Sequence, residues 1–152
     1  MRRAHSLTQQ DQRGAVMVEF AIILPLLLFM FVGIVDFGLI IREHQIVQNA
    51  AREGARISVT KEYRIATAGD ATAQAAVETA IKNRVVQYLQ QENITITTND
   101  VTVDQGFPIN FGGTWGTASQ ITVSYSRPML VGNGWPFGPV DLTGVSVFRN
   151  LY

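Results

Sequence analysis

The chain has 152 residues, twelve basic and twelve acidic side chains, no cysteine and a hydrophobic fraction of 47%. This length leaves room for one small domain beside a membrane segment and excludes a multidomain enzyme. The lack of cysteine excludes disulfides, thiolate metal sites and a cysteine nucleophile, while zero net charge lacks the basic excess that nucleic-acid binding needs. Two histidines, His5 and His44, are too few for a histidine-rich metal site, so no metal or cofactor is expected.

The first predicted element, after a polar leader at residues 1–14, is a membrane-spanning helix. From Phe20 to Ile41 the sequence carries one charge, Asp36, and these 22 residues would span about 33 Å as a helix, enough for a hydrocarbon core. The run is too long for a secretory signal and no A-x-A-like site follows it, which favours a retained anchor. Basic residues lie on both sides of the run, so their count does not fix its orientation.

A carboxylate, Glu19, stands at the start of the apolar run, where an unpaired charge is costly. One interpretation is an interfacial acid favoured by the helix dipole. The other comes from the residues in front of it, because Gly14 and Glu19, five apart behind a short basic leader, resemble a type IV prepilin processing site. The resemblance implies cleavage between Gly14 and Ala15 by a prepilin peptidase, with Glu19 fifth in the mature chain.

Cleavage would create an ammonium group on Ala15, and the resemblance implies that Glu19 pairs with this amine on a neighbouring subunit. A buried charge is tolerated when it is paired, so Glu19 would set the register between subunits. Removing the leader would also leave nine basic and eleven acidic side chains, which makes the mature chain mildly acidic.

The helical pattern continues beyond the membrane, and residues 15–60 are expected to form one transmembrane and stalk helix. Ala50, Gly54 and Ser58 place small residues at every fourth position, which would let another helix backbone approach closely. Chance spacing in an alanine-rich stretch is the alternative.

Three segments of this helix together resemble the TadE-like family, the minor pseudopilins of tight-adherence (Flp-type) pili. The segments are residues 18–25 (VEFAIILP), residues 36–38 (DFG) and the motif Asn49, Ala50, Ala51, Arg52, Glu53, Gly54, Ala55 and Arg56. The resemblance implies an inner-membrane protein with a cytoplasmic N-terminus and an extracytoplasmic head, in the membrane or in a pilus at the cell surface. Its implied partners are the lipid bilayer, a prepilin peptidase, other pilins or pseudopilins, and the secretion ATPase and platform proteins of the assembly machine.

The remaining residues, 61–152, are expected to form a small α+β head domain. Asp70 can cap a second helix that ends near residues 91–93, after which the apolar period changes from 3.6 to 2. About four short strands follow, at residues 94–98, 101–104, 120–126 and 144–149. Asn99 and Asp100 suit a turn, which predicts a hairpin over residues 94–104 within a small antiparallel sheet.

Two stretches rich in glycine, proline and aromatic residues, 106–116 and 132–139, are expected to interrupt the sheet as loops. Their aromatic side chains either pin these loops onto the sheet or stand exposed as anchors for a partner. The residues concerned are Phe107, Phe111, Trp115, Trp135 and Phe137.

Two functions remain after these exclusions. The first is a minor pseudopilin that takes part in the assembly or secretion of Flp pili. The alternative is a single-pass membrane-anchored binding module whose aromatic loops hold a ligand. An enzyme is not expected, because the chain has no G-x-S-x-G motif and His44 would have to serve any serine triad from a position next to the membrane.

Overall fold

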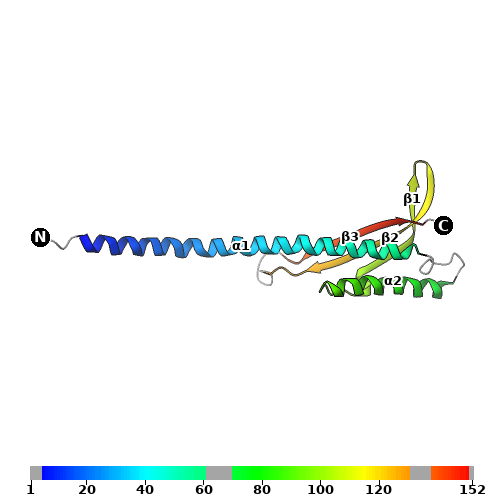
Figure 1. Ribbon diagram of the computed structural model, residues 1–152, viewed down its shortest axis with the longest axis horizontal. Coiled ribbons are helices and arrows are strands. Elements are labelled where there is room, and N and C mark those ends of the chain that lie inside the picture. Colours follow the sequence, from blue (N-terminus) through cyan, green and yellow to red (C-terminus); the bar gives the residue numbers. More distant parts are fainter. Residues whose placement is uncertain (1–4, 61–69, 131–137, 151–152) are drawn as a thin grey trace. The chain divides into compact units, whose positions relative to one another are not determined.

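The computed structural model describes residues 5–60, 70–130 and 138–150. In chain order they form helix α1 (His5–Ser58), helix α2 (Ala71–Gln91), a short 3-10 helix η1 (Thr98–Asp100), and strands β1 (Val101–Phe111), β2 (Thr114–Arg127) and β3 (Val140–Arg149) (Figure 1). The chain divides into two compact units, Met1–Leu39 and Ile40–Tyr152. The division falls within α1, so the second part of this helix belongs to the same unit as the sheet.

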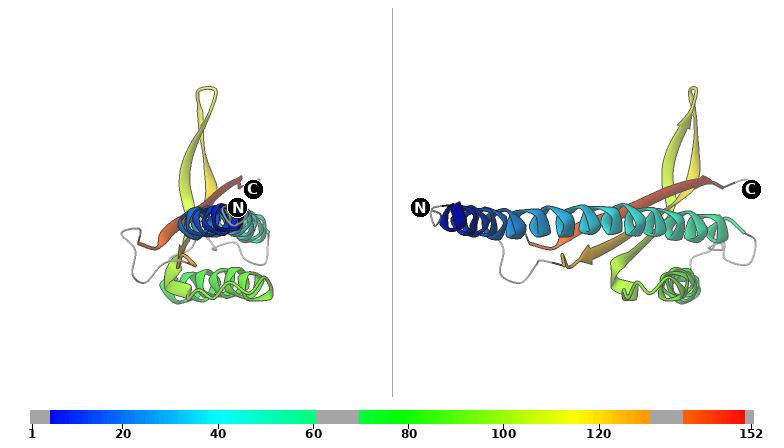
Figure 2. Two further views of the ribbon diagram at one scale, coloured as in Figure 1. Left: turned by 90° about the vertical axis from the view of Figure 1, so that its left-hand side faces the viewer. Right: turned by 60° about the vertical axis from the view of Figure 1, so that its left-hand side comes forward.

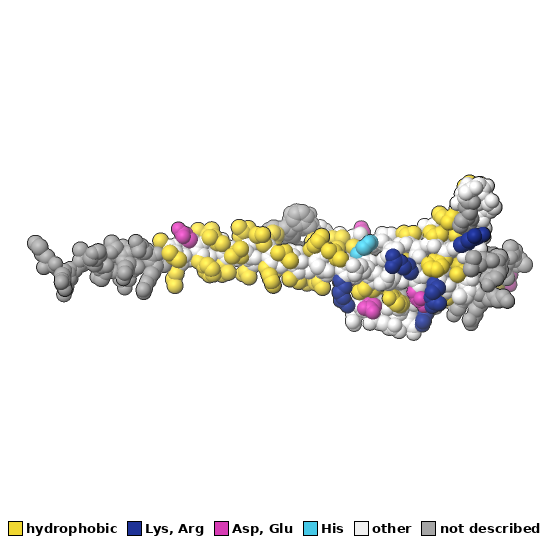
Figure 3. All heavy atoms as spheres, turned by 45° about the horizontal axis from the view of Figure 1, so that its top comes forward, with side chains coloured by type: hydrophobic (Ala, Val, Ile, Leu, Met, Phe, Trp, Pro, Cys, Tyr) yellow, Lys and Arg dark blue, Asp and Glu magenta, His cyan; other side chains and the backbone are white. Residues whose placement is uncertain are grey.

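The first unit contains the apolar half of α1. The helix continues through Pro25, and its exposed large apolar side chains between Val16 and Phe37 have exposed fractions of 38–75%. Figure 3 shows these hydrophobic side chains along the helix. By length and composition this is the one helix among the described residues that could cross a membrane, and it suggests a single-pass anchor.

The second unit has one hydrophobic core between the helices and one face of the sheet. Helix α1 contributes mainly small side chains to it, helix α2 contributes larger aliphatic ones, and β1 and β2 supply β-branched residues. The buried members are Val47, Ala50, Ala51 and Ala55 of α1, Ile81, Val85 and Leu89 of α2, Ile94 and Ile96, and Val101, Ile121 and Val123 of the sheet. The expected α+β class is therefore confirmed.

Helix α2 begins and ends where its capping residues dictate. The carboxylate of Asp70 accepts hydrogen bonds from the backbone amides of Thr72 and Ala73, as the sequence predicts. At the other end Asn93 adopts a positive φ of 61°, and the amide of Ile94 donates to the carbonyl of Leu89 at 2.9 Å. This is a Schellman ending, which turns the chain so that Ile94 enters the core.

The predicted hairpin over residues 94–104 is wrong, and the sheet has three strands rather than about four. Residues 94–97 form no strand, and Asp100 of η1 accepts hydrogen bonds from the amide and hydroxyl of Thr97, the residue that precedes η1. The alternation of Ile94 and Ile96 has another cause, because an extended segment that packs onto a core buries every second side chain whether or not it pairs with a strand.

The sheet is antiparallel with the order β1-β2-β3, and its hairpin joins β1 to β2 through Gly112 and Gly113, both at positive φ. The predicted loop at residues 106–116 lies within this hairpin, which is a correction to the sequence interpretation. Its end, which we call the β-arm (residues 107–117), projects away from α2 in both views of Figure 2. The second stretch, with Trp135 and Phe137, falls largely outside the described residues.

Candidate functional site

The predicted processing residues lie inside helix α1. Gly14 and Ala15 are exposed, and a side chain added at Gly14 would meet no described atom within 4 Å. Glu19, one turn further on, is also exposed, between Val18 and Phe20. The processing residues and the carboxylate therefore lie on one helical segment, at the start of the apolar stretch.

Asp36 behaves differently from the residues around it. Its exposed fraction is 2%, whereas the neighbouring side chains of Val35 and Phe37 are 40% and 64% exposed. A carboxylate that is withdrawn from solvent in an apolar stretch costs free energy unless it has polar partners. The acid inside the run is thus distinct from Glu19, which is open to its surroundings.

The motif at residues 49–56 has two faces with different roles. Ala50, Ala51, Gly54 and Ala55 are buried in the core, while the side chains of the polar positions point outward or lie at the edge of the core. A helix repeats every 3.6 residues, so the alternation of small and charged residues in the motif produces these two faces. The outward polar residues are Asn49, Arg52, Glu53 and Arg56.

Gly54 is a point of close approach in the core. A Cβ atom at this position would lie 2.6 Å from Cγ2 of Val85 in α2 and 3.2 Å from Cγ2 of Ile121 in β2. Ser58 is buried as well, and its carbonyl accepts a hydrogen bond from Gln105 Nε2 at 3.0 Å. The small residues Ala50, Gly54 and Ser58 therefore let α2 and the sheet approach α1 within this chain.

Strand β3 approaches α1 equally closely at Gly144, which the sequence analysis did not single out. A Cβ at Gly144 would lie 2.6 Å from the carbonyl oxygen of Val47. Next to it, the side-chain amide of Gln48 donates to the carbonyl of Val145 at 2.7 Å and accepts from its amide at 3.2 Å. An isolated glycine inside a strand pattern is the signal that could have indicated this contact.

The sequence patterns also did not predict an ion pair that joins β2 to α1. Arg127, at the end of β2, is 4% exposed, and its Nε lies 2.9 Å from Oε2 of Glu43 in α1. This oxygen receives no aligned hydrogen bond, so the contact is ionic rather than directional. Burial raises the pKa of Tyr125, and the Glu43 charge raises it further.

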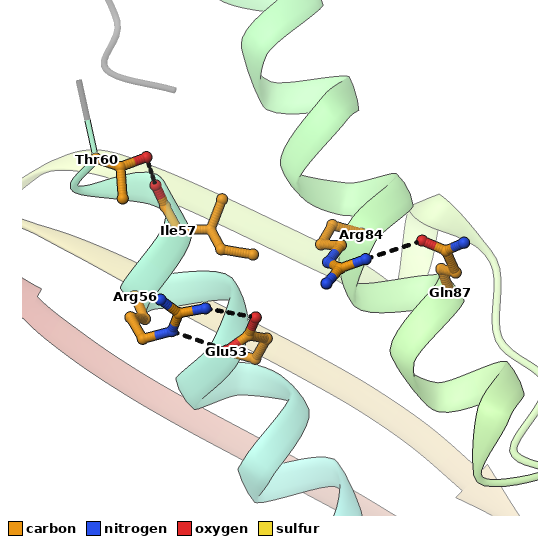
Figure 4. A network of polar contacts seen from close by, with 6 residues as sticks. All are labelled: Glu53, Arg56, Ile57, Thr60, Arg84 and Gln87. Carbon is orange, nitrogen blue, oxygen red and sulfur yellow. Dashed lines mark hydrogen bonds and ion pairs between the residues drawn. The ribbon is translucent and has the colours of Figure 1, made fainter. Parts of the chain in front are cut away.

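The charged face of the motif is shown in Figure 4. Arg56 donates two hydrogen bonds of 2.9 Å to the carboxylate of Glu53, and Arg84 in α2 donates to Gln87. The Arg56 hydrogen bonds lower the pKa of Glu53 against the opposing effect of burial, and the charges of Arg56 and Arg84 lower it further. Exposed pairs of this kind contribute little to stability, so they do not explain why the charges are there.

A polar hollow of about 280 Å³ lies on α1, lined by His44, Gln45, Gln48, Asn49 and Arg52. Gln48 is fixed by its two hydrogen bonds to Val145, and Arg52 donates to Oδ1 of Asn49 at 3.2 Å. Within the described parts of the chain, no three His, Asp or Glu side chains are grouped as a metal site would require. The arrangement suits recognition of a partner group.

These features define a class of protein: an α+β domain on a long helix whose first half is a membrane-anchor candidate and whose second half is part of the domain core. Residues 14–56 match the family model described as TadE-like protein. The match contains residues 18–25, 36–38 and 49–56, so the resemblance inferred from these segments is confirmed. It suggests a protein associated with the tight-adherence (Tad) pilus, acting at a membrane with other pilus components.

The match covers α1 from Gly14 to Arg56 and none of α2 or the sheet. No match was found among curated proteins or among solved structures. The interpretation of the sheet and the β-arm therefore depends on their own geometry.

Proposed function

We propose that this chain is a minor pseudopilin that takes part in the assembly or secretion of Flp/tight-adherence pili, without a catalytic role. The observation that supports this most directly is the TadE-like match, which begins at Gly14 and includes Glu19 and the motif at residues 49–56. The exposed apolar surface between Val16 and Phe37 suits a helix that changes its surroundings from lipid to neighbouring helices. The proposed partners are other pilins or pseudopilins, the secretion ATPase and the platform proteins.

Maturation is proposed to occur between Gly14 and Ala15, by prepilin peptidase at the cytoplasmic face of the inner membrane. Both residues lie in helical backbone, so the peptidase would have to open the helix locally to reach the peptide bond. Glycine in a helix interior costs about 1 kcal/mol relative to alanine, which makes this the easier place to open. The new ammonium of Ala15 would then pair with Glu19 of an adjacent subunit.

The N-terminal mass of the protein isolated from membranes tests this proposal. In cells that contain the peptidase we expect a chain that begins at Ala15, and in cells without it a chain that retains the leader. A matched variant, Gly14→Ala, should remain uncleaved in both. A full-length chain in peptidase-containing cells would refute the maturation step.

The second candidate function, a membrane-anchored binding module, is favoured by one observation. Trp115 in the β-arm is 71% exposed, and the chain carries no charged residue between Asp104 and Arg127. An exposed indole on an uncharged hairpin suits contact with a partner surface. Replacing residues 15–41 by an unrelated membrane span distinguishes the two functions, because a tethered module should still work and a pseudopilin should not.

A further inference from the structure

The exposed polar residues of α1 are not explained by the membrane anchor or by the core. Five of them surround the hollow of about 280 Å³ described above, and we call this site the α1 hollow (His44, Gln45, Gln48, Asn49 and Arg52). A water molecule occupies about 30 Å³ in the liquid, so a hollow of this volume can take the polar end of a side chain. All five residues lie within one compact unit of the chain.

Two of the lining side chains are held in place before any partner arrives. Gln48 is bound through both ends of its amide to Val145 at the edge of β3, and Arg52 donates to Asn49. A side chain that is already ordered loses less conformational entropy on binding. The guanidinium of Arg52 has five N–H donors, so the contact with Asn49 leaves donors for a further acceptor.

The chemistry of the lining selects an anion. Arg52 is permanently charged, and none of the five lining residues is acidic. The neighbouring acid, Glu53, already accepts two hydrogen bonds from Arg56. The α1 hollow therefore presents an unneutralised positive charge together with amide donors, and Arg matches the planar geometry of a carboxylate.

The anion could be a lipid phosphate or an acidic protein side chain, and the position of Arg52 distinguishes between them. The apolar run ends at Ile41, and eleven residues of helix advance about 17 Å. The headgroup layer adds only about 5–8 Å to each side of the hydrocarbon core. Arg52 is thus out of reach of a lipid phosphate in the same membrane, and an acidic protein side chain remains.

We propose that the α1 hollow receives an Asp or Glu side chain of a neighbouring pilin-type subunit, with Arg52 as its main ligand. This inference rests on the proposed function, since it assumes that such subunits meet. Subunits held in one membrane have a high effective concentration, so a single charged contact on each can guide assembly. This contact would act in addition to the one proposed for Glu19, and it would lie outside the membrane.

The test replaces Arg52 by lysine, because a carbodiimide couples a lysine amine to a carboxylate but does not couple an arginine. In the full-length R52K variant, a carbodiimide can join the introduced amine to a carboxylate in contact with it, with formation of an amide and loss of water. We expect an amide between position 52 and an Asp or Glu of a neighbouring subunit, identified by peptide mass spectrometry in membranes that contain the complete pilus machinery. The matched control is R42K, on the same helix but outside the hollow.

A second pair of variants measures the contact without chemistry. Arg52→Glu should reduce the recovery of the neighbouring subunit with this protein by about tenfold, as expected for one charge-assisted contact, and Arg42→Glu should change it by less than about twofold. The membrane level and N-terminal mass of each variant are compared with the parent protein. A larger loss with Arg42→Glu than with Arg52→Glu would overturn the proposal in favour of the lipid surface.

The outcomes separate this inference from the proposed function. If the chain begins at Ala15 and pili form, but R52K gives no amide between subunits, the α1 hollow is not the contact and the pseudopilin function stands. If the chain keeps its leader in cells that contain the peptidase, the proposed function is refuted, and the inference that rests on it is refuted with it. An amide to a protein that is not pilin-like would also overturn the inference.

Discussion

The two halves of helix α1 place apolar residues in opposite surroundings. Between Val16 and Phe37 the large aliphatic and aromatic side chains are exposed, whereas Val47, Ala50, Ala51 and Ala55 are fully buried. The difference in size has a physical reason. A lipid-facing surface gains from bulky side chains, while a helix that lies close to a sheet and a second helix has room only for small ones. Residue size therefore indicates what covers each half.

The largest expected effect comes from comparing two acids of the helix, Glu43 and Glu19. Glu43→Ala should destabilise the domain by up to about 3 kcal/mol, because the buried Arg127 loses one of its partners. Glu19→Ala, in the exposed half, should leave domain stability unchanged and reduce pilus assembly instead. Thermal unfolding of the purified full-length protein in detergent measures the first effect, and pilus yield the second. Equal loss of stability in both variants would contradict the division of the helix.

The glycines of the two halves provide the next comparison. Gly54→Leu should cost about 2–3 kcal/mol, since its side chain would overlap Val85 and Ile121. Gly38→Leu adds the same atoms where no described atom lies within 4 Å of the Cβ position, and should be tolerated. Protease resistance of the domain at increasing temperature measures both. A destabilised Gly38→Leu protein would show that the first half is also closely packed.

A smaller effect is expected at the edge of the sheet. Gln48→Ala removes two hydrogen bonds from Val145 and should cost about 1–2 kcal/mol. It also exposes backbone groups of the edge strand β3, which can pair with other chains. We therefore expect lower stability together with more aggregation on heating, measured by light scattering. The matched variant Gln45→Ala, with no such bonds to β3, should show neither effect.

The smallest effect is the pH dependence at Glu53. Its pKa is lowered in the folded protein, so its contribution to stability is complete above the ordinary glutamate pKa of 4.5 and is lost as the pH falls through the lowered value. Glu53 lies near the surface, so the loss should be only a few tenths of a kcal/mol. Unfolding of the parent protein and of Arg56→Ala between pH 6 and about pH 3 should show the difference shrinking toward zero.

Local signals in the sequence predicted the two helices, the Asp70 cap and the small antiparallel sheet. The apolar run, the helical period and the capping residue each act within a few positions, so they can be read without knowing the fold. The segments at residues 18–25 and 49–56 are equally local, and they predicted the family whose model matches residues 14–56.

The errors arose where distant residues decide. Residues 94–97 alternate like a strand, but none of the strands that the structure describes pairs with them. The stretch at 106–116 has the composition of a loop, yet Pro108 is acceptable in an edge strand and the two glycines form the turn. The Glu43–Arg127 pair joins residues far apart in the sequence, and no spacing indicates it.

The contacts of β3 with α1 have a consequence for how the protein is made. Gln48 and Val145 are 97 residues apart, so their contact cannot form until β3 has been synthesised. Contacts of such long range make folding slow. A nascent chain that lacks β3 therefore leaves the side-chain amide of Gln48 and the backbone of Val47 without these contacts.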